Sequence, residues 1–313
     1  MTAATLDTVA DALAVALPGR VQRDVPSAEH TTYRCGGPLR VLVRADDEAD
    51  VVALARVLRD HPDVATLVVG RGSNLLVADD GFPGVAIVLG GALDELALDT
   101  VHSRVAAGGA VAVPVLARRA GAAGIAGLEF FVGIPGSVGG AVRMNAGGHG
   151  RETRDVLRSA RVVDLSDGEV SDWDVDALAL GYRRSALTGH HVVVRADFDG
   201  HPDEPEACER RISAIVRWRR EHQPGGANAG SVFTNPPGDA AGRLIEAAGL
   251  KGLRIGGVTV SAKHANFFVA DSGARAADVR ALVAEVRRRV AEHSGVVLHP
   301  ELHMVGFATE DGS

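Results

Sequence analysis

The chain has 313 residues, of which 46% are hydrophobic and 23% charged, the composition of an ordinary globular protein with room for two or three packed units. The formal net charge of -7 argues against an extended nucleic-acid surface, although a local basic pocket for a phosphorylated metabolite is compatible with it. The sequence has no apolar run long enough to span a bilayer, and Cys35 and Cys208 are too far apart to suggest a disulfide scaffold or a cysteine-rich metal site. We therefore expect a reduced, cytoplasmic protein whose partners are small molecules, without a nucleic-acid or membrane partner.

The first third of the chain has a mixed α/β pattern. Residues 1–20 form an amphipathic helical pattern that contains Asp7 and Asp11, which argues against a signal peptide. A helix is also expected at 47–61, with Asp46 as its N-cap. The expected strands are 39–45, 66–70 and 84–90, with a polar turn segment at 71–83 between the last two.

The rest of the chain continues this alternation. A helical stretch at 111–127 leads into a segment, 127–150, that contains eight glycines. The pattern then predicts strands at 160–165 and 191–200, a boundary at 201–206, and helices at 206–222 and 274–295. The last helix has apolar residues near helical spacing and Gly295 as its C-cap.

Two glycine-rich segments suggest close approach of the backbone to another group. Gly70 and Gly72 follow an expected strand, but Leu75 replaces the third glycine of the dinucleotide-binding fingerprint. Residues 133–150 lack the terminal Gly-Lys-Ser/Thr of a phosphate-binding loop. Consecutive backbone amides can still surround a pyrophosphate. Two interpretations therefore stay open for both segments, which are tight turns or a large phosphate-bearing cofactor held by backbone.

The sequence "LHPELH" places His299 and His303 four residues apart, with Glu301 between them. Pro300 obstructs the single helical face that a zinc-protease motif needs, so a metal site is not expected. The alternation of Leu298, Pro300, Leu302 and Met304 instead predicts a strand. Glu301 would then point away from the apolar face, into solvent or into a cleft.

Three further polar positions have both an ordinary and a functional interpretation. Arg183 in "GYRRSAL" is either surface charge or suited to bidentate binding of a carboxylate. His264 in "SAKHANFFV" is either a residue at the end of a strand or part of a site. Ser231 in "NAGSVFTNP" lacks the following glycine of a nucleophile elbow, which leaves general-acid chemistry as its functional interpretation.

Seven segments in order resemble one known family. They are "TTYRCGGP", "GRGSNLLVADDGFPGV", "GLEFFVGIPGSVGGAVRMNAGGHG", "GYRRSAL", "NAGSVFTNPPGDAAGRLIEAAGLKGLRIGG", "SAKHANFFV" and "GVVLHPELHMVG". Together they closely resemble the UDP-N-acetylenolpyruvoylglucosamine reductases (UDP-N-acetylmuramate dehydrogenase, MurB) from about Thr31 to Gly306. The resemblance implies an α+β (mixed α/β) fold, namely an FAD-binding fold of the vanillyl-alcohol oxidase / p-cresol methylhydroxylase type with a separate α/β substrate domain.

The resemblance also implies a division of the chain by function. The FAD-binding domain is expected at 1–198, with two α/β subdomains at about 1–92 and 93–198. The substrate-binding domain is expected at 199–300. The C-terminal segment 301–313 is expected to return to the FAD-binding part.

The family's reaction is a two-step reduction that belongs to peptidoglycan precursor synthesis. NADPH passes hydride to noncovalently bound FAD, and the reduced flavin then delivers hydride to C3 of the enolpyruvyl group of UDP-N-acetylglucosamine enolpyruvate. By resemblance, Ser231 protonates C2 to give UDP-N-acetylmuramate, Arg183 holds the enolpyruvyl carboxylate, and Glu301 completes the proton-handling network. Preorganised contacts of this kind stabilise the charge that develops in the reaction.

The remaining site residues are also carried by the resemblance. The expected FAD contacts lie in the two glycine-rich segments and are Gly70, Arg71, Gly72, Ser73, Asn74, Leu75, Gly133, Ile134, Pro135, Gly136, Gly139, Gly140, Asn145, Ala146 and Gly147. The expected substrate contacts are Tyr182, Arg219, Asn235 and Lys263. Thr234 stands where relatives often carry lysine, and Arg219 is a candidate to supply the missing positive charge.

The stretch between Arg183 and Ser231 is too short for the tyrosine-bearing substrate loop of one family subtype, so we expect the subtype without that loop, as a monomer. Two alternatives share the cofactor, namely a flavin-binding protein without turnover and an FAD-dependent oxidase of the wider flavoprotein group. A metal-dependent hydrolase based on His299 and His303 is the least favoured hypothesis.

Overall fold

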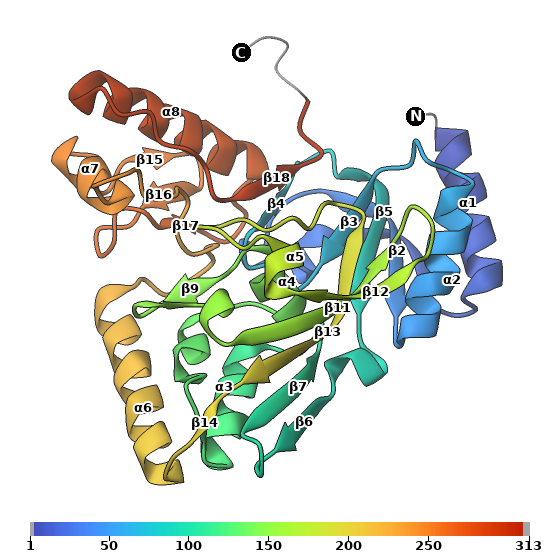
Figure 1. Cartoon of the computed structure of the whole chain (residues 1–313). Helices are drawn as coiled ribbons and strands as arrows, with labels where there is room; N and C mark the ends of the chain where they lie inside the picture. Colours follow the sequence, from blue (N-terminus) through green and yellow to red (C-terminus); the bar gives the residue numbers. More distant parts are fainter. Residues whose placement is uncertain (1–2, 309–313) are drawn as a thin grey trace. The chain divides into compact units, whose positions relative to one another are not determined.

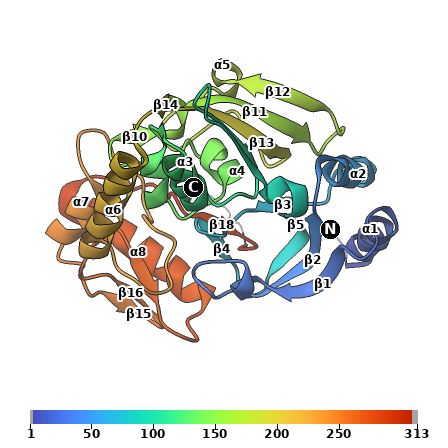
Figure 2. The same cartoon turned by 90° about the horizontal axis from the view of Figure 1, so that it is seen from below.

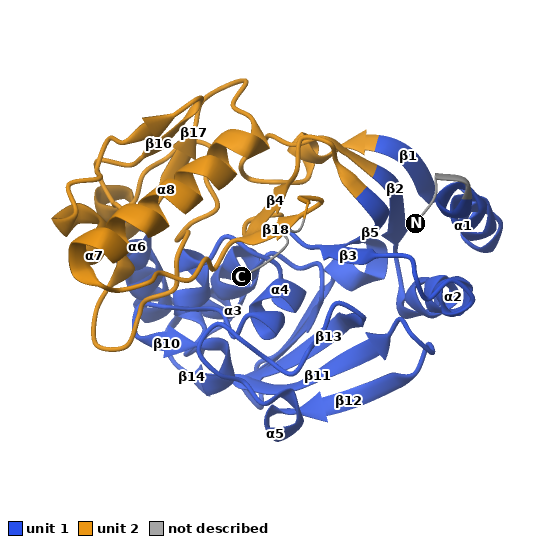
Figure 3. Cartoon of the chain, turned by 90° about the horizontal axis from the view of Figure 1, so that it is seen from above, with its two compact units in different colours: residues 1–24, 40–71, 83–218 blue, residues 25–39, 72–82, 219–313 orange. Residues whose placement is uncertain are grey.

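The computed structural model describes residues 3–308 and divides into two compact units (Figure 3). Unit 1 comprises Met1–Asp24, Arg40–Arg71 and Pro83–Trp218, and unit 2 comprises Val25–Leu39, Gly72–Phe82 and Arg219–Ser313. The chain therefore alternates between the two units, and each unit is built from three separate segments. The expected division by function at residues 198 and 300 stays a prediction, and residues 309–313 of its last segment lie outside the described residues.

The first sheet has four strands in the order β1-β2-β5-β3, and most of its residues belong to unit 1. Its strands are β1 (Val21–Pro26), β2 (Pro38–Ala45), β3 (Thr66–Val69) and β5 (Phe82–Leu89). Helices α1 (Ala3–Ala16) and α2 (Glu48–Arg59) lie side by side against it (Figures 1 and 2), because their apolar faces share a core with β2 and β5. The N-cap of α2 is Asp47, whose side chain accepts from Asp50 N at 2.8 Å. Asp46, the expected cap, instead pairs with Arg44 and Arg20.

The second sheet of unit 1 has five antiparallel strands in the order β12-β11-β13-β7-β6. These strands are β6 (Leu96–Asp99), β7 (Arg104–Gly108), β11 (Leu157–Asp164), β12 (Val170–Asp174) and β13 (His191–Asp199). Helix α3 (Val113–Ala122) and the short α4 (Val138–Arg143) pack into its core, and Figure 2 shows α4 next to β13. The second glycine-rich segment, 133–150, which contains α4, therefore lies against the five-stranded sheet.

Short elements complete unit 1. They are η2 (Gly91–Asp94), β8 (Ile125–Ala126), η3 (Glu129–Gly133), β9 (Gly147–Gly148), β10 (Arg151–Glu152), η4 (Thr153–Asp155), α5 (Val175–Leu178) and β14 (His201–Pro202). Helix α6 (Pro205–His222) follows, and the boundary between the units falls within it. Of its predicted apolar face, Ile212 is buried and Ile215 and Val216 are partly buried, whereas Trp218 is exposed.

Unit 2 contains a three-stranded antiparallel sheet of β15 (Arg254–Ile255), β16 (Val258–Val260) and β17 (Phe268–Ala270). Helices α7 (Ala241–Ala247) and α8 (Ala276–Ser294) share its core, and η1 (Ser27–Glu29) also belongs to this unit. The predicted C-terminal helix is confirmed, because its five apolar positions are buried and Gly295 ends it with a φ of 72°.

A two-stranded parallel pair in unit 2 corrects two expectations. Strand β4 (Leu75–Val77) lies in the segment expected to be a polar turn, and it pairs with β18 (His303–Val305). The strand expected around 298–304 is thus limited to its last residues. Pro300, expected on the apolar face, is exposed, and it forms an isolated bridge with Phe233 outside any regular strand. Within residues 3–308, none of the helices is long and apolar enough to cross a membrane.

Candidate functional site

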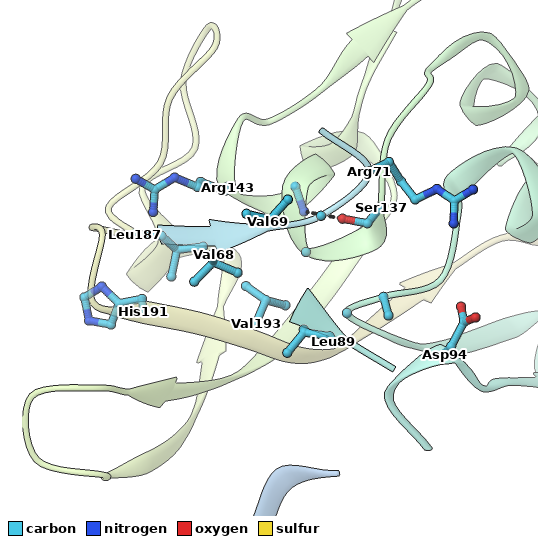
Figure 4. A pocket seen from close by; sticks show the side chains of 15 residues that line it. Val68, Val69, Arg71, Leu89, Asp94, Ser137, Arg143, Leu187, His191 and Val193 are labelled. Carbon is cyan, nitrogen blue, oxygen red and sulfur yellow. Dashed lines mark hydrogen bonds between the residues drawn. The ribbon is translucent and has the colours of Figure 1, made fainter. Parts of the chain in front are cut away.

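Unit 1 contains a cavity of about 140 Å³ between the ends of its two sheets (Figure 4). Its walls come from the end of β3, the turn after β7, the start of α4 and the start of β13. The lining residues are Val68, Val69, Gly70, Arg71, Leu89, Asp94, Gly109, Ala110, Ser137, Gly139, Gly140, Arg143, Leu187, His191 and Val193. The volume is below the roughly 300–1,000 Å³ of pockets that enclose a drug-sized ligand, so the cavity suits one part of a larger molecule.

Backbone packing forms one side of this cavity. The segment that starts α4 runs beside the turn after β7, because Gly139 N donates to Gly109 O at 2.9 Å and Val138 N donates to Val111 O at 2.8 Å. A Cβ atom on Gly109 would lie 1.9 Å from the carbonyl oxygen of Val193, so only glycine fits there. A Cβ on Gly70 would lie 2.4 Å from Ser137 Oγ, which is the N-cap group of α4. The two predicted glycine-rich segments therefore meet at Gly70.

Polar groups lie at the two ends of the cavity and aliphatic side chains lie between them (Figure 4). Arg143 and His191 are at one end, and Arg71 and Asp94 are at the other. The Arg143 guanidinium donates to Thr188 O, and burial lowers its pKa. Aliphatic walls with charged ends suit a flat ring that is attached to phosphate groups.

The predicted cofactor residues of unit 1 have different positions. Gly70, Arg71, Gly139 and Gly140 line the cavity, whereas 133–136 and 145–147 do not. In the first of these ranges, Gly133 ends η3, Ile134 packs against the core, Pro135 is exposed, and Gly136 O accepts from Val113 N. The second range carries the buried Asn145 and forms short backbone contacts with residues 151–153. The structure thus brings only part of the predicted set to one cavity.

The predicted cofactor residues Gly72–Leu75 belong to unit 2. At Gly72 the obstacle to a side chain is the protein itself, because a Cβ would lie 1.9 Å from His30 O and the φ is 60°. Ser73 is half-buried, and Leu75 begins β4. Asn74 Nδ2 donates to the carbonyl oxygen of Glu301 at 3.0 Å, and Asn74 O accepts from His303 N at 3.1 Å. Asn74 therefore fixes the backbone around a predicted catalytic residue.

Ser231 lies in an extended segment of unit 2 that is held on both sides. On one side, Ser231 forms a bridge with Phe267, and the buried Asn266 holds Phe233 by two side-chain hydrogen bonds. On the other side, Glu301 N donates to Val232 O at 2.8 Å. The backbones of Ser231 and Glu301 are therefore joined through the single residue Val232. The structure brings together two of the three predicted catalytic residues within this unit.

Arg183, the third predicted catalytic residue, belongs to unit 1. It occupies a tight turn in which Gly181 and Arg184 exchange two backbone hydrogen bonds. Its Nη2 donates to Gly147 O at 3.3 Å, and its guanidinium carbon lies 5.1 Å from the centre of the Tyr182 ring. Tyr182 is itself exposed. The predicted arginine is thus joined to the second glycine-rich segment.

The predicted substrate contacts of unit 2 all have protein partners. Asn235 Oδ1 accepts from Ala241 N at 3.0 Å at the start of α7. Lys263 Nζ donates to Arg220 O at the end of α6. Arg219 donates to Gln223 at 2.8 Å, and burial lowers its pKa. Lys263 and Arg219 each use one of several N–H donors in these bonds, so both can keep their protein partner and still bind a ligand.

Thr234, at the position where relatives often carry lysine, donates from Oγ1 to His299 O at 3.2 Å. The hydroxyl therefore adds a hydrogen bond between the two backbone segments, 231–234 and 299–301, that the bond from Glu301 N to Val232 O also joins. It adds no positive charge to this part of unit 2.

Sequence reasoning missed most of the cavity lining. The glycine pair 108–109 at the end of β7 was an available signal, because it resembles the arrangement of Gly70 directly after β3. Asp94, Arg143 and His191 carry no local pattern, since they meet only in the fold. Across residues 3–308, no group of three or more His, Cys, Asp or Glu side chains is arranged to hold a metal ion.

Comparison with known proteins relates both parts of the chain to described domains. Residues 39–174 match a model described as an FAD binding domain. Residues 222–305 match the C-terminal domain of UDP-N-acetylenolpyruvoylglucosamine reductase.

Relatives extend this similarity over the full chain. The UDP-N-acetylenolpyruvoylglucosamine reductase of Paramagnetospirillum magneticum is 43% identical over 92% of this chain and 93% of its own length. That of Methylorubrum populi is 43% identical over 100% of both chains. The crystal structure of UDP-N-acetylenolpyruvylglucosamine reductase (MurB) from Thermus caldophilus superposes with a TM-score of 0.78 at 36% identity, covering 91% of this chain and 99% of that one. The resemblance seen in the sequence and the expected fold class are therefore confirmed, and the chain belongs to the UDP-N-acetylenolpyruvoylglucosamine reductase family.

Proposed function

We propose that this chain reduces UDP-N-acetylglucosamine enolpyruvate to UDP-N-acetylmuramate with FAD as cofactor and NADPH as reductant, in peptidoglycan precursor synthesis. The observation that carries this proposal is identity of 43% along the whole chain to reductases that are named for this reaction. Ser231, Arg183 and Glu301 are assigned to this reaction by the resemblance of the segments around them. A location in the cytoplasm, a monomeric state and the subtype without the tyrosine-bearing loop are parts of the same proposal.

The cavity of unit 1 fits part of FAD. Its glycine-lined wall carries no side chains, and its aliphatic side chains lie between the charged ends. Gly70, Gly109, Gly139 and Gly140 would hold the cofactor by backbone, with Arg71 or Arg143 near its polar groups. FAD, when bound, accepts hydride from NADPH and donates it to the enolpyruvyl carbon C3.

The chain's own residues would manage the charge and the proton of the reduction. Arg183 would hold the enolpyruvyl carboxylate, because a guanidinium can bind both of its oxygens. Ser231 would give its proton to C2, and Glu301 would stabilise the donor and its hydrogen bonds. The link through Val232 supports a joint role for Ser231 and Glu301, since a displacement of one backbone displaces the other.

The first test separates the two half-reactions in the purified holoprotein. Ser231→Ala is expected to leave reduction of the flavin by NADPH within about twofold of wild type, because no proton is given to C2 in that step. Reoxidation by the enolpyruvyl UDP-sugar is expected to slow by about 10²-fold or more, the usual cost of losing one preorganised group. Ser213→Ala, which changes an exposed serine of α6, is the matched control.

Three other results would contradict the proposal. Equal slowing of both half-reactions would remove the proton-donor role of Ser231. A flavin that the UDP-sugar does not reoxidise in wild type would favour a binding protein without turnover. Oxygen as the preferred acceptor would favour an oxidase.

A further inference from the structure

Asn145 is a fully buried polar residue in the second glycine-rich segment, and its side chain is occupied by the protein. Its Nδ2 donates to Glu152 Oε2 at 2.9 Å and to Gly181 O at 3.1 Å. Its Oδ1 accepts from Arg154 N at 2.9 Å. Both donor hydrogens and one acceptor position are therefore used, and the side chain has no donor left for a cofactor.

The bond to Gly181 reaches the turn that carries Arg183. The carbonyl oxygen of Gly181 accepts from Asn145 Nδ2 and also from Arg184 N, at 3.2 Å, so it closes the turn. Arg183 within this turn has a φ of 55°, a backbone conformation that costs a non-glycine residue about 1–3 kcal/mol and persists only where neighbouring contacts impose it. The Asn145 amide is one of these contacts.

The same segment also holds the side chain of the arginine, because Gly147 O accepts from Arg183 Nη2 at 3.3 Å. Residues 145–147 thus fix the start of the turn through Asn145 and the guanidinium through Gly147. We infer that Asn145 is a positioning residue that sets the conformation of Arg183 for the substrate, and that its side chain is not a flavin ligand. This inference rests on the proposed function.

Asn145→Asp, made in a Glu152→Gln background so that the new carboxylate does not face the carboxylate of Glu152, tests the inference against Glu152→Gln alone. It keeps the shape and the acceptor for Arg154 N, while its carboxylate form cannot donate to Gly181. Reduction of the flavin by NADPH, with FAD in excess, is expected to stay within about twofold of that background. Reoxidation by the enolpyruvyl UDP-sugar is expected to slow by about 10- to 100-fold, since small misplacements of a binding group cost up to about 10²-fold. Amide exchange of Arg184 is expected to speed up, which is a readout independent of activity.

The matched control is Thr153→Val, which removes a buried hydrogen bond to Ala146 O in the same segment and leaves the bond to Gly181 intact. It is expected to change neither the substrate half-reaction nor Arg184 exchange by more than about twofold, because Ala146 O keeps its bond from Thr153 N. Asn145→Ser provides a second variant if the aspartate form does not fold.

A double-mutant comparison separates positioning from general damage. If Asn145 acts through Arg183, then Asn145→Asp in a Glu152→Gln background that also carries Arg183→Ala is expected to slow reoxidation by no more than about twofold further. Additive slowing, slowing of both half-reactions, or loss of FAD binding would overturn the inference. A wild-type protein that the UDP-sugar leaves reduced would refute the proposed function, and this inference with it, before any variant is compared.

Discussion

The substitution Asn266→Ala removes a buried side chain that holds the segment carrying Ser231. It removes two hydrogen bonds to the backbone of Phe233, at 2.9 and 2.8 Å, where Asn266 is 3% exposed and Phe233 is 1% exposed. Each such bond contributes about 1 kcal/mol net, and a buried N–H or C=O left without a partner costs about 1–3 kcal/mol. We therefore expect local opening of the segment to become easier by about 2–5 kcal/mol.

Hydrogen exchange followed by mass spectrometry measures this change in the holoprotein. Fluorescence would not, because Trp173 and Trp218 both belong to unit 1. At about 1.4 kcal/mol per tenfold, amide protection of Phe233 and Thr234 should fall by between about 30-fold and a few thousand-fold. Arg254→Ala is the control, because the bonds of its guanidinium to Thr259 and Asp271 are exposed, and its effect should stay within about 0.5 kcal/mol. Equal protection in the two variants would refute the reasoning.

Three further outcomes are expected. Asp79→Ala should destabilise α8 by about 0.5–2 kcal/mol in exchange measurements, because its carboxylate caps the first two amides of that helix; unchanged protection there would contradict the capping role. Burial raises the pKa of the Cys35 thiol to about 11 and also raises that of Cys208, so a thiol reagent at neutral pH should label neither in the native protein and both in denaturant. Arg243 lowers the pKa of the Asp239 carboxyl to about 2, so its contribution to stability is present above the unfolded pKa of about 3.9 and is lost as pH falls through about 2; an NMR titration midpoint near 4 would show that the pair does not form.

Helices with a long apolar period could be predicted from the sequence, because each turn of such a helix repeats the same pattern. The helix at 274–295 was predicted together with its cap at Gly295, and α8 has both. Local alternatives were harder to distinguish, since Asp46 and Asp47 are both acceptable N-caps, and in the structure it is the side chain of Asp47 that accepts from Asp50 N. Strand β4 was missed because a three-residue strand that pairs with the distant β18 has no period of its own.

The residues of the candidate site could likewise be predicted only where the sequence carries a pattern or a resemblance. Ser231, Arg183 and Glu301 were found by resemblance, because single polar residues carry no periodic signal. Glycine content indicated close backbone approach, yet at Gly72 the approaching group is His30 of the same chain. Asn74 bonds to Glu301 and Asn145 bonds to Gly181, and because both of these partners lie far away in sequence, the two roles required the fold.

The most direct test of the account is anaerobic reoxidation of the NADPH-reduced holoprotein. We predict that UDP-N-acetylglucosamine enolpyruvate alone restores the absorbance of oxidised flavin and yields UDP-N-acetylmuramate in an amount equal to the flavin. A flavin that stays reduced with this UDP-sugar, and is reoxidised only when oxygen is admitted, would contradict the account.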